Sequence, residues 1–448
     1  MAMRPASARP ARAHRARPAH PSRRGAALLA TLAALAVGAS GASSAFGAEA
    51  GVNLLAPNGA QLGQVRELGT HWVRMFVSWP DIEPGRGAFA PAQLAYYEGI
   101  FAALPAGSKV IVDAVNTPSW ESGSSDPHAP PNPREYAAFV GALAQRWNGR
   151  VTAWELWNEE DAARWWSGGP DPAAYVALLK ATYPVVKTAD PGATVVLGGL
   201  TGNDYEFLER VYQAGGKGFF DAVGVHTDTA CDVLSPYQFL RGANNRMIDD
   251  SFLAYREVRA TMLANGDGKP IWMTEASWRT TSAACSEGAF AGHKPEGVTP
   301  ALQATYLSQA YHCLAQDPYV QVALWFPLGD ERMIMSGLVR SNGARKPSFA
   351  AMRAYVRDGD RLTEPCGVLT GPKITVLSPA NNVHYTGPLP IHVLASSSQG
   401  IFRITLKIDG KLIRNYGGAT YPARLAGYLR WQGAKHITSG RHTLTFVA

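Results

Sequence analysis

Several motifs that define large enzyme classes are missing from the 448 residues of this chain. There is no Gly-x-x-x-x-Gly-Lys-Ser/Thr loop for nucleotide phosphates, no Gly-x-Ser-x-Gly elbow for a serine nucleophile and no His-Glu-x-x-His pair for zinc. No cluster of histidine, cysteine and aspartate has the spacing of metal ligands, so we expect neither a metal nor another cofactor. The sequence therefore does not indicate a P-loop nucleotide-binding protein, a serine hydrolase with a nucleophile elbow or a zinc enzyme with a His-Glu-x-x-His motif.

Cysteine is scarce, with only Cys231, Cys285, Cys313 and Cys366, and no two of these form a C-x-x-C clip. Four cysteines allow three pairings. In an exported protein they are expected to form structural disulfides, and buried free thiols are the alternative. We predict that neighbours in the sequence pair, which gives Cys231–Cys285 and Cys313–Cys366.

Charged residues are also few, at 17%, although the formal net charge is +7. Residues 1–50 contain seven arginines and one acid, Glu49, so this segment carries +6 and leaves +1 for residues 51–448. A nearly neutral remainder indicates no polyanionic partner, and we expect no binding to nucleic acid. Hydrophobic residues reach 46%, enough for a sizeable core.

The first fifty residues have the three-part plan of a secretory signal peptide. An arginine-rich stretch ends at Arg24, a mostly apolar run covers 26–37, and small residues follow, with A-x-A at 48–50 and a second candidate cleavage site at 43–45. A membrane anchor is the alternative, but the run is shorter than the ~20 residues that span a bilayer. We therefore predict that residues 1–50 are a signal peptide. The protein is then secreted or held at the cell surface, without stable membrane insertion.

Short apolar runs alternate with helical patterns between residues 51 and 371. The runs expected to form strands are 52–55, 71–77, 109–115, 151–157, 193–200, 222–225, 271–274 and 320–326. The helical patterns include 61–68, 133–147, 172–188, 246–264 and 300–315. This alternation indicates βαβ units, and eight runs match an α/β fold of the (β/α)8 TIM barrel type. A doubly wound open sheet is the alternative, but the first βα turn has no glycine-rich phosphate loop.

The sequence pattern changes after Gly371, where short segments rich in β-branched residues are separated by glycine and proline. The expected strands are 373–377, 391–395, 401–408, 411–414 and 442–447, and Asp409-Gly410 marks a hairpin. We predict a small all-β, immunoglobulin-like sandwich over 372–448 as an accessory domain. Sugar binding, a spacer role and contact with another domain all remain open for it.

Two carboxylates end predicted strands of the barrel. The fourth strand runs Trp-Glu-Leu-Trp-Asn-Glu to Glu159, and the seventh runs Ile-Trp-Met-Thr-Glu to Glu275. Because active sites of such barrels lie at the carboxyl ends of the strands, the two groups are expected to meet at the mouth. A carboxylate pair that flanks a sugar is what glycoside hydrolysis requires. The acids that follow, Glu160 and Asp161, are expected at the surface, where a helix begins.

These two strands resemble the acid/base and nucleophile strands of the clan A retaining glycoside hydrolases. Within the clan the chain is most similar to family 39 and related bacterial, cellulase-like members. Further segments that carry the resemblance are Trp72–Arg74, Trp79–Pro84, Thr117–Trp120 and Asp190–Ala193. The resemblance spans about 51–358 and implies that Glu159 is the acid/base and Glu275 the nucleophile. It also implies a β linkage.

Other polar strand-end residues are candidates for substrate binding. Arg74 would keep the nucleophile ionised, since a nearby cation lowers a carboxylate pKa. Asn158 would donate to the sugar 2-hydroxyl, and His226 closes the sixth strand at the mouth. Glu155 is expected in a buried ion pair with Arg74. The family commonly has His-Pro-Tyr where this chain has His226-Thr227-Asp228, so the residue that contacts Glu275 in place of the tyrosine stays open.

Tryptophans near strand ends are candidate sugar platforms, because sugar rings stack their C–H faces on aromatic planes. We predict this role for Trp79, Trp120 and Trp325, and an outer subsite at Trp165-Trp166. Ordinary core packing is the alternative for each of them.

Together these features predict an exported, O-glycosyl hydrolase that cleaves oligo- or polysaccharide by a two-carboxylate double displacement. A monomer with a carbohydrate substrate as its partner is expected, and exo and endo action both stay open. A non-catalytic carbohydrate-binding or cell-wall protein is the alternative, as is a transglycosidase that uses the same residues.

Overall fold

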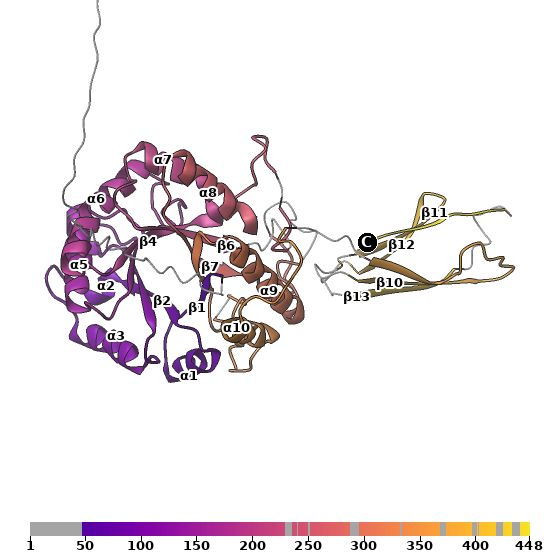
Figure 1. The fold of residues 1–448 in the computed structure, drawn as a ribbon, viewed down its shortest axis with the longest axis horizontal. Helices are drawn as coiled ribbons and strands as arrows, with labels where there is room; N and C mark the ends of the chain where they lie inside the picture. The colour runs from indigo at the N-terminus through magenta and orange to yellow at the C-terminus, as the bar shows by residue number, and fades with distance from the viewer. Residues whose placement is uncertain are drawn as a thin grey trace, which may run out of the picture. The chain divides into compact units, whose positions relative to one another are not determined.

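A closed barrel of eight parallel strands forms the larger part of the computed structural model (Figure 1). The structure describes residues 47–228, 235–239, 241–249, 251–286, 295–331, 334–367, 373–396, 401, 403–417, 424–431 and 440–448. The barrel strands follow one another in chain order and β1 pairs with β8. They are β1 (Glu49–Asn53), β2 (Trp72–Ser78), β3 (Lys109–Val115), β4 (Ala153–Asn158), β5 (Thr194–Leu200), β6 (Ala222–Asp228), β7 (Ile271–Ser277) and β8 (Val320–Trp325). The predicted TIM barrel is thereby confirmed.

Helices connect the strands and cover the outside of the barrel (Figure 1). Within the described residues they are α1 (Gly59–Leu68), α2 (Trp79–Ile82), α3 (Pro91–Ala103), α4 (Ser119–Ser122), α5 (Pro133–Arg146), α6 (Pro172–Ala189), η1 (Thr201–Asn203), α7 (Tyr205–Gln213), η2 (Phe252–Ala254), α8 (Tyr255–Ala264), α9 (Pro300–Gln316) and α10 (Pro347–Asp358). Proline opens α3, α5, α6, α9 and α10, where its missing N–H is not needed. Asn58, Asn132 and Asp171 cap the N-termini of their helices through side-chain oxygens.

The predicted helix over 246–264 is wrong in its first part. The α-helix begins only at Tyr255, after the short turn η2. Upstream, Asn245 has a φ of 61°, and Arg241 bridges to Met247 in an antiparallel turn. The backbone hydrogen bonds of this turn replace those that a helix would have used.

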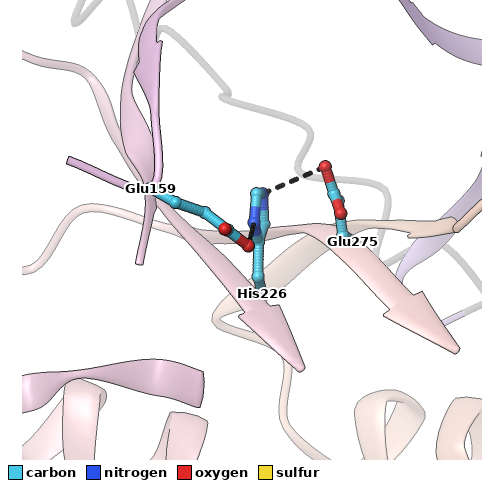
Figure 2. A group of neighbouring side chains, drawn as sticks. All are labelled: Glu159, His226 and Glu275. Atoms are coloured by element: carbon cyan, nitrogen blue, oxygen red, sulfur yellow. Dashed lines mark hydrogen bonds and ion pairs between the residues drawn. The ribbon is translucent and has the colours of Figure 1, made fainter. Parts of the chain in front are cut away.

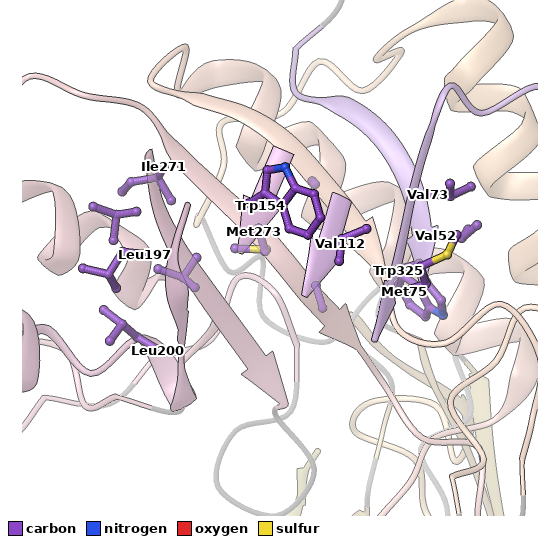
Figure 3. Close-up of a cluster of buried hydrophobic side chains, with 14 of the residues drawn as sticks. Val52, Val73, Met75, Val112, Trp154, Leu197, Leu200, Ile271, Met273 and Trp325 are labelled. Carbon is purple, nitrogen blue, oxygen red and sulfur yellow. The ribbon is translucent and has the colours of Figure 1, made fainter. Parts of the chain in front are cut away.

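Two apolar clusters build the barrel core, one on each face of the sheet. The outer cluster lies between the strands and the helices, and Figure 3 draws part of it, including Val73, Met75 and Trp325. The inner cluster fills the lower barrel with side chains from seven strands. We call it the apolar layer, and it comprises Trp72, Ile111, Ala153, Val196, Ala222, Trp272, Val322 and Leu324. Neighbours along a strand alternate between the two clusters, as the pleat requires.

The first strand begins before the predicted domain boundary at residue 51. Glu49 pairs with Val322 and Ala50 with Ala323 in the ladder that closes the barrel. The Glu49 carboxylate accepts a hydrogen bond from Trp72 Nε1 at 2.7 Å, and the carbonyl of the buried Ala48 accepts one from Tyr355 at 2.9 Å. Residues 48–50 therefore belong structurally to the barrel.

In the described part of the C-terminal region there are two three-stranded antiparallel sheets, in the orders β13-β10-β9 and β12-β11-β14. The strands are β9 (Lys373–Ser378), β10 (Leu389–Ser396), β11 (Arg403–Ile408), β12 (Lys411–Gly417), β13 (Arg424–Trp431) and β14 (Leu444–Val447). Asp409 and Gly410 both have positive φ values, 49° and 79°, as a tight turn between β11 and β12 requires. The predicted sandwich and its hairpin are confirmed, but β13 was not predicted.

One of the two predicted disulfides lies within the described residues. Cys313 on α9 is bonded to Cys366, which confirms that pairing. Cys231 lies outside the described residues, so the Cys231–Cys285 pairing stays a prediction. Among the helices that the structure describes, none combines the length and the apolar character needed to cross a membrane.

Candidate active site

A buried arginine occupies the centre of the barrel, one layer above the apolar layer. Arg74 on β2 is fully buried and bonds to Glu155 at 2.6 Å and Asp113 at 2.7 Å. The same guanidinium donates to Glu275 at 2.6 Å. It also donates to two amide oxygens, those of Asn53 and Asn158, each at 3.0 Å. We call the group below the mouth the polar layer, and it comprises Asn53, Arg74, Asp113, Glu155 and Thr274.

The polar layer is highly charged for a barrel interior. Burial disfavours the charge of Arg74, but the carboxylates of Glu155, Asp113 and Glu275 raise its pKa above the ordinary value. Burial also raises the pKa of Asp113 well above its usual range, although Arg74 opposes that shift. The predicted ion pair between Glu155 and Arg74 is present. Arg74 therefore carries a permanent charge that fixes the orientation of the carboxyl groups around it.

Three side chains meet above this layer at the mouth, and Figure 2 shows His226 between the two glutamates. Glu159 follows β4, His226 lies on β6 and Glu275 lies on β7. His226 Nδ1 is 3.0 Å from Glu159 Oε1, and His226 Nε2 is 3.7 Å from Glu275 Oε1. A carboxylate oxygen of Glu159 and one of Glu275 lie within 4.8 Å of each other. The structure thus brings together the two predicted carboxylates with Arg74, Asn158 and His226.

The partners of Glu275 differ from the His-Pro-Tyr pattern of the resembling family. Arg74 donates directly to Glu275 Oε1, and His226 is the next polar neighbour. The β6–β7 register shifts between Val225 and His226, so that His226 pairs with Glu275 in the ladder. Arg74 and His226 are therefore the described residues that contact the Glu275 carboxylate in place of a tyrosine.

The two glutamates differ in their electrostatic surroundings. Burial raises the pKa of Glu159, but the hydrogen bond and charge of His226 and the charge of Arg164 lower it, and the net direction is down. Burial raises the pKa of Glu275, with His226 and Arg74 opposing and Glu159 reinforcing, and the net direction is up. Burial lowers the pKa of His226, but Glu275 and Glu159 raise it above the ordinary value. These shifts favour a Glu159 carboxylate that faces a protonated His226.

Glu159, His226 and Glu275 are also the donor set that could hold a metal among the described residues. Two carboxylates and one imidazole would suit zinc. However, the two glutamates approach opposite ring nitrogens of His226, whereas a metal needs one nitrogen and both carboxylates around a single point. The guanidinium of Arg74 also already bonds to Glu275. The arrangement fits a carboxylate pair bridged by His226 better than a metal centre.

A segment after β4 passes over the outer side of Glu159. Arg164 donates to Glu159 Oε2 from Nη2 at 2.5 Å and from Nε at 3.0 Å, and its side chain is 66% exposed. The next residue, Trp165, is half-buried and stacks parallel on Phe76 of β2, with ring centroids 6.4 Å apart. Trp157 Nε1 donates to the Trp165 carbonyl at 2.8 Å, which ties the segment down. Both carboxylate oxygens of Glu159 are therefore bonded, Oε1 to His226 and Oε2 to Arg164.

The predicted sugar platforms are placed differently from one another. Trp79 and Trp325 have no exposed surface, so neither offers a ring face to a sugar here. Trp79 opens α2 and stacks on Phe139 in the helical layer. Trp325 belongs to the outer cluster because its neighbour Leu324 takes the inward position. The platform prediction is wrong for these two residues.

Trp120 and Trp165 retain exposed surface and stay candidates for substrate contact. Trp120 on α4 is half-buried and lies edge-on to Trp79, with Arg86 over its ring. Trp166 is buried at 2% exposure, so only Trp165 of the predicted outer pair is accessible.

The expectation that Glu160 and Asp161 are surface acids is wrong. Glu160 is fully buried, and burial raises its pKa well above the usual range. Burial also raises the pKa of Asp161 to about 8, against a hydrogen bond from Thr201. The backbone explains the difference, because Trp157 and Glu159 both have positive φ values, 76° and 49°. The chain turns sharply there, which leaves Glu159 at the mouth and directs Glu160 against β5 beside Gly198.

Sequence reasoning missed Asn53, Asp113, Thr274 and Arg164. Asp113 had a usable signal, because it is the one acid inside the otherwise apolar run 110–115. It also shares the inward parity of Ile111 in the apolar layer. Thr274 Oγ1 donates to Glu155 at 2.9 Å and lies 3.1 Å from His226 Nε2, which parity with Trp272 could have suggested. Arg164 lies in an irregular loop and had no such signal.

The comparisons with known proteins agree with this architecture. The C-terminal region matches the model of a bacterial Ig domain over residues 372–445. No curated protein matches the chain. A family 39 glycoside hydrolase from Bacteroides cellulosilyticus WH2 matches with 19% identity and a TM-score of 0.58, over 86% of this chain and 79% of that one. A monomeric β-xylosidase from Caulobacter crescentus CB15 matches with 17% identity and a TM-score of 0.53, over 81% and 82%.

A third solved structure, a GH5_18 protein from Streptomyces cattleya, matches with 16% identity and a TM-score of 0.53, over 70% of this chain and 80% of that one. These matches show that the barrel fold is shared with solved glycoside hydrolases. Family 39 members are among them, and this is the family that the strand resemblance indicated.

Proposed function

We propose that the protein is an exported retaining glycoside hydrolase that cleaves O-glycosidic, β-configured bonds in an oligo- or polysaccharide. One observation carries the proposal, the separation of the two mouth carboxylates. Oxygens of Glu159 and Glu275 lie within 4.8 Å of each other. Retaining enzymes place their carboxyl groups about 5–5.5 Å apart, whereas inverting enzymes need about 6.5–9.5 Å to hold a water.

In the first step Glu275 attacks the anomeric carbon and the bond to the leaving oxygen breaks. Arg74 holds Glu275 Oε1 at 2.6 Å, which orients the carboxylate and opposes the rise in its pKa that burial causes. Asn158, whose side-chain oxygen accepts from Arg74, is oriented with its amide nitrogen free of that contact and available to a sugar hydroxyl. A glycosyl ester on Glu275 results.

Glu159 transfers the proton in both steps. It protonates the leaving oxygen first and then takes a proton from the water that hydrolyses the ester. The lowered pKa of Glu159 in the free protein runs against the acid role. Sugar entry would remove water from the mouth and displace the exposed Arg164, and both changes raise the pKa of a carboxylate. The acid form would thus arise in the substrate complex.

Export is supported by the arginine-rich leader pattern, the Cys313–Cys366 disulfide and the bacterial Ig module. The predicted signal peptide would be removed upstream of Ala48, because residues 48–50 contribute to the barrel. The substrate class is proposed from the site and the fold, and the sugar is left open.

The test is a panel of aryl β-glycosides and polysaccharides assayed with a chain that begins at Gly47. Glu159→Gln and Glu275→Gln are each expected to lower kcat by about 10³-fold or more. Azide should restore part of the activity of the Glu159 variant through a glycosyl azide of retained configuration, whereas any glycosyl azide that the Glu275 variant forms should have inverted configuration.

The alternatives give different results in the same assay. A wild type that binds sugars and cleaves no member of the panel would favour the non-catalytic binding protein. Products longer than the substrate would favour the transglycosidase. Products of inverted configuration would contradict the retaining mechanism.

A further inference from the structure

Arg164 blocks the proton-transfer position of Glu159 in the free protein. Glu159 Oε2 accepts two hydrogen bonds from Arg164, and Oε1 faces His226 Nδ1. A carboxyl group that donates a proton to a leaving oxygen needs one oxygen free for that proton. Because His226 is buried at the centre of the site, the exposed Arg164 is the partner that can move.

The position of Arg164 also defines what it can contact after it moves. Glu159 Oε1 faces the buried His226 inside the site, whereas Oε2 faces the exposed Arg164 at the solvent side. In the proposed reaction Glu275 attacks one side of the scissile bond, and Glu159 protonates the group that departs on the other. Arg164 therefore borders the region that receives the leaving group, and Trp165 follows it there.

A displaced arginine must regain what it loses. Breaking a charge-assisted, two-fold hydrogen bond costs free energy unless another anion replaces the carboxylate. A neutral sugar offers only hydroxyl groups, whereas a sugar acid offers a carboxylate with the planar geometry that a guanidinium matches. An anionic leaving group would release Glu159 and replace its carboxylate as a partner of Arg164 in the same movement.

We propose that Arg164 is a specificity-determining residue that selects substrates with an acidic group, such as a uronate carboxylate, on the leaving-group side of the scissile bond. The proposal rests on the proposed glycosidase function and names its substrate class. Arg164 is bonded to Glu159 when the site is free and to the substrate carboxylate when it is filled. Substrate charge thereby releases the acid that cleaves it.

Other charged groups also act on Glu159 and are unchanged by this movement. They are His226 on β6, Glu275 on β7, Asp113 on β3 and the neighbouring Asp161. Arg164 is the exposed member of the set that surrounds the carboxylate. Its removal should therefore shift the titration of Glu159 without rebuilding the site.

The experiment compares two aryl glycosides of the sugar that the panel identifies, one with a 4-carboxyphenyl and one with a 4-carbamoylphenyl leaving group. The ratio of their kcat/KM values is measured for the wild type and for Arg164→Gln. Arg164→Gln is expected to lower the carboxylate preference about tenfold, the size of one charge-assisted hydrogen bond. With the carbamoyl probe, the alkaline limb of the kcat/KM profile should move to higher pH, because Glu159 stays protonated longer.

Two control variants accompany the measurement. Arg164→Lys keeps the charge and should retain part of the preference. Arg345→Gln removes another exposed arginine that is bonded to a glutamate, Glu67, on α1, and should leave the ratio and the pH profile unchanged.

The outcomes separate the two proposals. If wild type and Arg164→Gln show the same ratio and the same alkaline limb, the role of Arg164 is overturned while the glycosidase stands. An equal gain on both probes would make Arg164 a plain obstruction and would also overturn it. A wild type that cleaves neither probe nor any member of the panel contradicts the glycosidase itself.

Discussion

The apolar layer and the polar layer use the same strands two residues apart, yet different forces hold them. On β2 Trp72 lies in the apolar layer and Arg74 in the polar layer, and on β3 Ile111 and Asp113 repeat that step. In the apolar layer the side chains stabilise the fold because their apolar surface is removed from water. In the polar layer the charged groups have lost their hydration and are stabilised by one another. One barrel interior therefore contains a layer that tolerates reshaping and a layer that depends on every partner.

The strongest test of this difference is Arg74→Gln. It leaves Asp113, Glu155 and Glu275 buried without their cation, and such a loss typically costs about 3–5 kcal/mol. We expect kcat to fall by about 10³-fold or more, because Glu275 loses its orientation. Urea unfolding and the glycoside panel measure the two effects. Arg74→Lys keeps one charge without the guanidinium fork. Its stability and its kcat should lie between those of the wild type and those of Arg74→Gln. A stable, active Arg74→Gln protein would contradict the dependence on partners.

Trp272→Ala is the matched change in the apolar layer. It removes a large side chain that is 5% exposed and should cost about 3–5 kcal/mol of unfolding free energy. Because the cavity lies below the charges, kcat and its pH profile at low temperature should stay within about twofold of the wild type. Thermal unfolding and low-temperature kinetics check this pair of results. A shifted pH profile would show that the two layers are coupled.

Gly199→Ala tests whether the close approach of β5 to His226 is needed for the geometry of the site. A Cβ atom at this position on β5 would lie 1.9 Å from His226 Nε2, so the imidazole must move. Overpacking of this kind costs about 1–3 kcal/mol. We expect kcat/KM to fall about 10- to 100-fold, with most of the change in kcat, since His226 sits between the catalytic carboxylates. Gly218→Ala, where an added Cβ meets no atom within 4 Å, is the control.

Asp113→Asn should give the smallest effect, and its sign depends on pH. Burial raises the pKa of Asp113, so the folded protein binds this proton more tightly than the unfolded chain does. The wild-type contribution is complete below the unfolded pKa of about 4 and is lost as pH rises through the folded value. As the pH rises from 4.5 to 8.5, the free energy of unfolding of the variant should therefore increase relative to that of the wild type, by on the order of 1 kcal/mol. Urea titrations at the two pH values give the difference, and a gain at the lower pH instead would reverse the assigned protonation.

The parts of the fold that the sequence predicted are those with local periodicity. All eight barrel strands lie within the predicted runs or within three residues of their ends, because buried strands are short apolar segments. The strand β13 (Arg424–Trp431) lacks such a run, and it is defined by pairing with β10. Pairing between distant segments is not visible in a local pattern.

The site followed the same rule. Glu159, Glu275, Arg74 and His226 were found because strand ends and side-chain parity locate the mouth. The exposure of Trp79, Glu160 and Arg164 could not be found this way. Each follows a strand at a point where the backbone leaves the pleat, and the direction of its side chain depends on φ values and loop packing. Loop geometry is set by tertiary contacts that no short pattern encodes.

The five-fold bonding of Arg74 has a consequence for assembly. Its partners come from β1, β3, β4 and β7, and the Arg74–Glu275 contact joins residues 201 positions apart. Contacts of such long sequence separation form late in folding, because the intervening chain must be ordered first. An unclosed barrel would leave the cation without its partners and its carboxylates misaligned. The site can therefore be catalytically active only after the barrel has closed, and partly folded molecules are inactive.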